Sequence, residues 1–126
     1  MKRLIIPIAV CLLALVSCKK NEADAIYVNF TNQTGQDITN LTIDNTTIGT
    51  LKTNASTGFL KFDSFTTNSG LPFCNFKGER SNQPMEGLSQ FPGCGTEINS
   101  LKKGRYNVEI KISQFNSTDY FDLSFK

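Results

Sequence analysis

The chain has 126 residues, of which 39% are hydrophobic and 19% charged, and its formal net charge at pH 7 is +2. This length suits one domain with a single hydrophobic core. The sequence contains no histidine, which excludes Ser-His-Asp and Cys-His catalytic arrangements and the usual zinc ligand sets. The weak net charge gives no electrostatic signature for nucleic-acid binding.

The N-terminus combines a basic start, Lys2 and Arg3, with an almost uninterrupted apolar stretch at residues 4–16. As a helix this stretch would rise about 20 Å, short of the roughly 30 Å hydrocarbon core of a bilayer. We therefore predict that residues 1–17 are a cleaved secretion signal rather than a permanent membrane span. Its removal leaves 11 of the 13 basic residues to balance the 11 acidic ones, so the mature chain is neutral overall.

The end of the apolar stretch reads Leu15-Val16-Ser17-Cys18. It resembles the lipobox of bacterial lipoproteins, in which the peptidase cuts before the cysteine and the cysteine carries the lipid. The resemblance implies that Cys18 is the first mature residue and the lipid attachment site. The residues after it are mostly polar and charged, so we expect 18–25 to comprise the lipidated cysteine and a flexible spacer. Lys19, rather than Asp, follows the cysteine, which in that family favours the outer membrane. The alternative is an ordinary cysteine after an ordinary signal peptide.

Residues 26–126 show repeated two-residue alternation of apolar and polar side chains, separated by turns rich in Asn, Thr and Gly. This pattern predicts seven strands, at residues 26–30, 37–44, 47–52, 58–65, 71–77, 106–112 and 120–125. We expect a bulge at Asn40, where the alternation breaks, and a final hairpin joined by the loop 113–119. No segment shows helical periodicity, so the prediction is one all-β domain, a single antiparallel β-sandwich.

The clearest strand, residues 106–112, is preceded by Leu101, Gly104 and Tyr106 in a Leu-x-x-Gly-x-Tyr pattern. This motif resembles the start of a late strand in immunoglobulin-like and fibronectin-like sandwiches. The resemblance implies a tyrosine corner, in which the Tyr106 hydroxyl hydrogen-bonds to the backbone upstream. It bears on the fold and not on an activity.

Cys74 and Cys94 remain as an even pair in a chain predicted to be secreted, which favours a disulfide between them. Closing a loop of this length would stabilise the fold by roughly 3 kcal/mol in the chain-entropy model. The alternatives are metal binding or a free reactive thiol, and neither is supported by histidines or by a CxxC spacing.

Residues 78–100 contain several glycines and two prolines and few apolar residues, so we expect a long irregular connection. A connection of this length is often functional, and the predicted disulfide would close the loop 78–95. Lys77, Glu79, Arg80 and Phe91 combine charge with an aromatic ring, and they are the candidate binding residues. The alternative is a tolerated surface insertion.

These patterns predict no enzyme, cofactor or metal site, because the loop carboxylates Glu79 and Glu86 have no fixed separation. We expect a lipid-anchored envelope protein that binds a protein partner through the loop 78–95. The alternative function is a carbohydrate-binding accessory lipoprotein of a glycan-uptake system, by analogy with other β-sandwich lipoproteins. Its aromatic candidates are Tyr27, Tyr106 and Tyr120, since the chain has no tryptophan.

Overall fold

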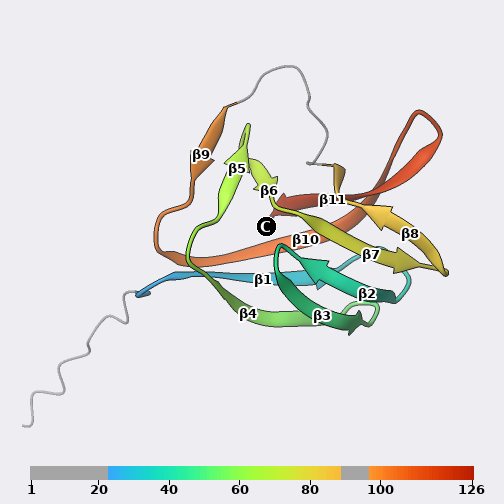
Figure 1. Cartoon of the computed structure of the whole chain (residues 1–126), viewed down its shortest axis with the longest axis horizontal. Coiled ribbons are helices and arrows are strands. Elements are labelled where there is room, and N and C mark those ends of the chain that lie inside the picture. Colours follow the sequence, from blue (N-terminus) through green and yellow to red (C-terminus); the bar gives the residue numbers. More distant parts are fainter. Residues whose placement is uncertain (1–22, 89–96) are drawn as a thin grey trace, which may run out of the picture.

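The computed structural model describes residues 23–88 and 97–126, which form 11 strands and no helix. Two four-stranded sheets pack against each other, and a three-stranded sheet lies at one side of them (Figure 1). The predicted all-β sandwich is confirmed, whereas the expected number of about seven strands was too low. In the described part of the chain, no helix is long and apolar enough to cross a bilayer.

The first sheet has the order β11-β10-β1-β4, with bounds Thr118–Phe125, Gly104–Phe115, Ile26–Asn32 and Ser56–Phe62. Its β1–β10 pair is parallel, starting at Ile26 opposite Gly104, which departs from the purely antiparallel sandwich that we expected. The chain enters β10 beside the start of β1, where the Gly104 amide donates to the Ala25 carbonyl oxygen over 3.0 Å. Both strands therefore begin at the same end of the sheet and run in the same direction.

The second sheet has the order β3-β2-β7-β8, with bounds Thr46–Leu51, Ile38–Ile43, Phe76–Arg80 and Gln83–Glu86. All of its pairs are antiparallel. The expected irregularity in β2 is confirmed, because Asn40 has a φ of 47° and the register shifts on both sides of the strand there.

The third sheet has the order β6-β5-β9, with bounds Leu71–Phe73, Thr66–Asn68 and Ile98–Ser100. It lies at the upper left of the view in Figure 1, on the other side from the β10–β11 hairpin. The single strand expected at residues 71–77 is thus two strands, β6 and β7, which belong to different sheets.

Tight two-residue turns join three of the hairpins, where the sequence pattern predicted longer strands or loops. Ser69-Gly70, Ser81-Asn82 and Asn116-Ser117 each have positive φ at both positions and join strands that pair directly on either side. Such two-residue turns twist in the same sense as the strands that they connect. Residues 78–100 are therefore not one irregular connection, since they contain the end of β7, all of β8 and β9. The final hairpin likewise turns at residues 116–117 rather than over 113–119.

The core lies between the two large sheets and is dominated by phenylalanine. Phe30 of β1 is fully buried, and its ring centre lies 6.5, 6.4 and 6.0 Å from those of Phe62, Phe65 and Phe76. Phe76 in turn packs edge-to-face on Phe121 at 5.2 Å. Alternation along β1, β7 and β11 sends these rings inward from both sheets, which is why the polar residues between them reach the surface.

Candidate functional site

The predicted site residues divide between the described and the undescribed parts of the chain. Cys18, Phe91 and Cys94 lie outside the described residues, so the lipid site and the Cys74–Cys94 disulfide remain predictions. Cys74 follows β6 and is buried, with 6% of its surface exposed.

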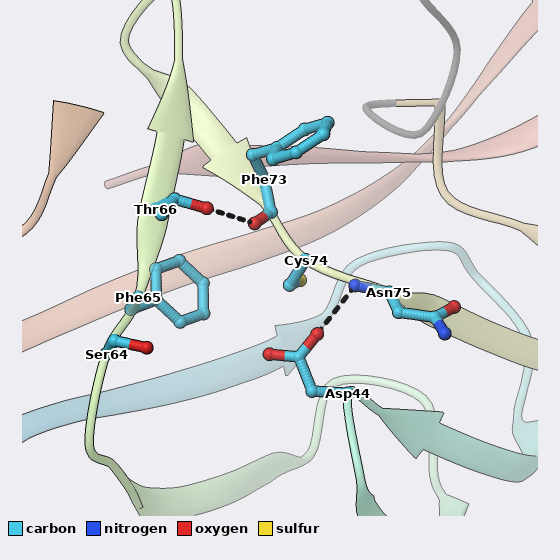
Figure 2. A pocket seen from close by; sticks show the side chains of 7 residues that line it. All are labelled: Asp44, Ser64, Phe65, Thr66, Phe73, Cys74 and Asn75. Atoms are coloured by element: carbon cyan, nitrogen blue, oxygen red, sulfur yellow. Dashed lines mark hydrogen bonds between the residues drawn. The ribbon is translucent and has the colours of Figure 1, made fainter. Parts of the chain in front are cut away.

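Cys74 forms part of a hollow of about 390 Å³ between the third sheet and the β2–β3 turn (Figure 2). The Asn75 amide donates to the Asp44 carboxylate over 2.8 Å, and the Asp44 amide donates to the Asn75 carbonyl oxygen over 2.7 Å. On the opposite wall, the Thr66 hydroxyl donates to the Phe73 carbonyl oxygen over 3.0 Å. These bonds fix the turn and the β6–β7 connection around the thiol.

The electrostatics of this hollow oppose thiolate chemistry. Burial, and then the negative charge of Asp44, raise the pKa of the Cys74 thiol well above its ordinary value. A protonated thiol is a poor nucleophile and a poor metal ligand. We therefore assign no reaction to this hollow.

A second hollow, of about 430 Å³, lies where the β7–β8 hairpin meets the start of β11, and we call it the β8–β11 groove. Two of the predicted binding residues, Lys77 and Glu79, line it. Both belong to β7 rather than to a loop, and the alternation of that strand directs them away from buried Phe76 and Gly78. The full lining is Asn40, Lys77, Gly78, Glu79, Pro84, Met85, Glu86, Thr118, Asp119 and Tyr120.

Charge in the β8–β11 groove is predominantly negative. Lys77 is its one cation, against the carboxylates of Glu79, Glu86 and Asp119. The Lys77 ammonium lies 3.8 Å from the Glu86 carboxylate, and both side chains are about half exposed. An exposed ion pair of this kind contributes about 1 kcal/mol or less, so it can open for a ligand. The groove can therefore accept cationic groups or hydrogen-bond donors, with the Tyr120 ring as an apolar contact.

Arg80 does not belong to the β8–β11 groove. Its side chain crosses to the β1–β2 connection, where the guanidinium donates to the Thr34 carbonyl oxygen over 3.2 Å. Its Nε is buried and has no hydrogen-bond partner among the described residues. The structure thus separates Arg80 from Lys77 and Glu79, with which we had grouped it.

Sequence reasoning missed the contribution of β11 to the groove. Residues 118–120 lie more than 30 positions beyond Glu86, and only the packing of the two hairpins brings them together. A parallel bridge between Gly87 and Phe121 marks that contact. No local pattern points to this contact, and the closely packed Gly78 of the groove lies against β2, where an added Cβ would sit 2.8 Å from Ile38 Cγ2.

The three tyrosines have different surroundings. The Tyr106 hydroxyl donates to the Lys102 carbonyl oxygen over 2.8 Å, which confirms the expected tyrosine corner. Tyr27 lies on the outer face of the first sheet, and its hydroxyl donates to the Asp24 carboxylate over 2.7 Å. Only Tyr120 lines the β8–β11 groove.

Among the described residues, no group of three or more potential metal-ligating side chains comes together. No family model, curated protein or solved structure matches this chain.

Proposed function

We propose that this chain is a lipid-anchored protein of the bacterial envelope and that its β-sandwich binds a protein partner through the β8–β11 groove. The anchor proposal rests on the sequence Leu15-Val16-Ser17-Cys18, which lies only a few residues before the first described residue, Ala23. A lipidated cysteine holds a protein at a membrane without a spanning helix, because acyl chains contribute about 0.8 kcal/mol per buried methylene.

The observation that carries the binding proposal is the composition of the groove. Glu79 and Glu86 come from one hairpin and Asp119 and Tyr120 from another, so four recognition groups converge on one hollow. Three carboxylates and one aromatic ring suit a partner segment that presents lysine or arginine side chains. Such a segment would replace the exposed Lys77–Glu86 ion pair with its own charge pairs.

The groove also lies far from the predicted anchor. Tyr120 pairs with Ser113, and Ser113 lies nine positions along β10 from Gly104, which pairs with Ile26 at the start of β1. At about 3.3 Å per residue, these positions place the groove roughly 30 Å from the end of the sandwich at which the tether leaves. In Figure 1 the β8 strand and the β10–β11 hairpin lie on the opposite side from the start of β1. A groove at this distance is open to partners while the anchor holds the other end.

Crosslinking in intact cells tests the binding proposal. We expect the full-length protein to form a specific adduct that is lost in Glu79→Lys and in Asp119→Lys. Glu97→Lys is the matched control, because it makes the same charge change at an exposed position directly before β9, outside the groove. An adduct that survives both groove variants would contradict the proposal.

Membrane fractionation tests the anchor separately. Cys18→Ala should move the protein from the membrane fraction to the soluble fraction, because the lipid would have no attachment site. Unchanged fractionation of Cys18→Ala would contradict the lipoprotein proposal without touching the binding proposal.

Carbohydrate binding is the second candidate, and the position of Tyr120 favours it over a site at the other tyrosines. A ring beside carboxylates can stack on a sugar while the carboxylates accept bonds from its hydroxyl groups. Binding on a glycan array that Tyr120→Ala abolishes and Tyr27→Ala preserves would support this function in place of a protein partner.

A further inference from the structure

Three hydrogen bonds hold the short connection between β9 and β10, and one of them joins it to the residue before β1. The Leu101 amide donates to the Phe65 carbonyl oxygen over 2.8 Å, and the Tyr106 hydroxyl donates to the Lys102 carbonyl oxygen. The Gly104 amide closes the connection by bonding to Ala25. Consequently Lys102 and Lys103, which this connection carries, are held at the end of the sandwich where the N-terminal tether leaves.

Two more cations lie beside this connection. In the register of the first sheet, Tyr27 of β1 pairs with Lys61 on one side and with Arg105 on the other, so all three share the outer face. The Arg105 guanidinium lies 5.5 Å from the Tyr27 ring centre and 5.3 Å from that of Phe59, which is 43% exposed. Lys61, Lys102, Lys103 and Arg105 are all exposed, and we call them the tether-end basic cluster.

Within the described chain, ion pairs involve Lys77 and Lys111 and none of the four cluster cations. Three carboxylates lie nearby. Those of Asp24 and Asp63 line a hollow with Lys61 and Lys103. That of Asp44 lines an adjoining hollow with Lys61 and Asp63.

Two of these three carboxylates accept hydrogen bonds from the protein. Asp24 accepts the Tyr27 hydroxyl, and this bond first, then a bond from its own backbone and the charges of Lys61 and Lys103, lower the pKa of its carboxyl. Asp44 accepts the Asn75 amide. The tether end thus presents four cations against three carboxylates, whereas the β8–β11 groove presents one against three.

The length of the tether brings this end close to the membrane. Residues 19–22 separate the predicted lipid site, Cys18, from Ala23, the first described residue. Even fully extended, they reach only about 17 Å. The tether itself adds Lys19 and Lys20 against Glu22. Anionic headgroups attract basic residues that come within about one Debye length, roughly 8–10 Å, of the membrane surface.

We infer that the tether-end basic cluster docks on the anionic phospholipid surface to which Cys18 is anchored, with the Tyr27 and Phe59 rings at the headgroup level. This inference rests on the proposed lipid anchor. Docking sets the orientation of the domain: the first sheet's tether end faces the bilayer, and the β8–β11 groove faces away from it. The basic cluster recognises the negative charge of the phospholipid phosphates, and aromatic rings such as Tyr27 and Phe59 favour the membrane interface.

Lysine footprinting of the full-length lipidated protein in vesicles tests the inference. The protein is reconstituted in phosphatidylcholine vesicles with or without 30% phosphatidylglycerol and treated with a neutral acetylating reagent. Acetylation of Lys102, relative to that of exposed Lys77 of β7 in the same molecule, should slow at least 5-fold on anionic vesicles and recover in 0.5 M NaCl. Equal ratios on both kinds of vesicle would overturn the inference.

Paired variants identify the cations responsible. Each basic residue near the surface is worth about a 5-fold change in binding, so Lys61→Gln with Lys103→Gln should remove most of the protection of Lys102. Lys52→Gln with Lys111→Gln makes the same charge change away from the tether end and should preserve that protection. Loss of protection to the same extent in both pairs would overturn the assignment to this cluster.

Flotation separates failure of docking from failure of the anchor. A lipid-anchored protein floats with neutral vesicles in 0.5 M NaCl, where the basic cluster contributes little. If the protein does not float with neutral vesicles, the anchor proposal fails. Flotation with anionic vesicles at low salt then tests docking without an anchor. If the protein does not float with those vesicles either, the docking inference is overturned as well.

Discussion

The Tyr106 hydroxyl donates a hydrogen bond of 2.8 Å to the carbonyl oxygen of Lys102, four residues upstream. Gly104 lies between them in sequence, and an added Cβ at Gly104 would be 3.4 Å from the Tyr106 ring. The ring therefore folds over the glycine, and the motif Leu-x-x-Gly-x-Tyr describes a local structure that the chain closes on itself. This structure fixes the start of β10 next to β1.

We predict that Tyr106→Phe destabilises the fold by about 1 kcal/mol, because it deletes one hydrogen bond and keeps the ring. Tyr27→Phe is the control, since it removes a hydroxyl that bonds to Asp24 at the surface and should change stability by about 0.5 kcal/mol or less. The midpoints of urea unfolding measure both effects. Equal shifts of the urea midpoint in the two variants would show that the Tyr106 hydrogen bond stabilises the fold no more than the surface bond of Tyr27 does.

Asn32 is the other polar group that organises strand ends. Its side chain is fully buried and donates to the carbonyl oxygens of Gln36 and Leu51 over 2.7 and 2.9 Å. Its side-chain oxygen accepts the Thr34 amide and hydroxyl over 3.0 and 2.7 Å. One amide thus joins the end of β1 to the next connection and to the end of β3.

We predict that Asn32→Ala destabilises the fold by about 3 kcal/mol or more, because it leaves several buried polar groups without partners. Asn107→Ala changes the same residue type at an exposed position of β10 and should alter stability by no more than about 0.5 kcal/mol. Denaturant unfolding compares the two. A loss below about 1 kcal/mol for Asn32→Ala would mean that water replaces these bonds.

Phe30 lies at the centre of the aromatic core, with three phenylalanine rings within 6.5 Å of its own. We predict that Phe30→Ala destabilises the domain by about 3–5 kcal/mol, through lost burial and the cavity left behind. Phe115, which is 55% exposed, supplies the control, and its replacement by alanine should have little effect on the thermal midpoint. Similar midpoints for the two variants would be inconsistent with this core.

The raised pKa of Cys74 predicts a dependence of stability on pH when the cysteines are reduced. The folded state holds the thiol neutral, whereas the unfolded thiol ionises above about pH 8.5. The contribution is therefore fully present below that pH and is lost as the pH rises, by up to about 1.4 kcal/mol per pH unit. Urea midpoints of wild type and Cys74→Ala, measured with reductant between pH 7.5 and 10, isolate this term because all other groups are common. Parallel pH profiles would contradict it.

Several elements of the fold could be predicted because their causes are local. Alternation in β1 and β10 assigns Val28, Phe30, Val108 and Ile110 to the core, and all four are fully buried. The break in alternation at Asn40 marked the bulge in β2, and the spacing from Gly104 to Tyr106 marked the corner. Each of these signals lies within a few residues, where backbone sterics and side-chain direction act.

Other features could not be predicted because their causes are distant in sequence or unusual in composition. The turns at Ser81-Asn82 and Asn116-Ser117 lack glycine, although both positions of each adopt positive φ. They were therefore absorbed into longer loops. The parallel direction of β1 and β10 depends on the end of the sheet at which the chain enters β10, and no residue in either strand encodes that direction.

The sequence by itself determined the all-β class, the inward and outward faces of the main strands and the tyrosine corner, and its residues Leu15-Val16-Ser17-Cys18 carry the resemblance to a lipobox on which the anchor proposal depends. Only the tertiary structure decided that Lys77 and Glu79 meet Asp119 and Tyr120, that Arg80 turns away, and that four cations gather at the tether end. The reason is physical: alternation fixes the face on which a side chain lies, but its neighbours across strands depend on long-range pairing of hairpins.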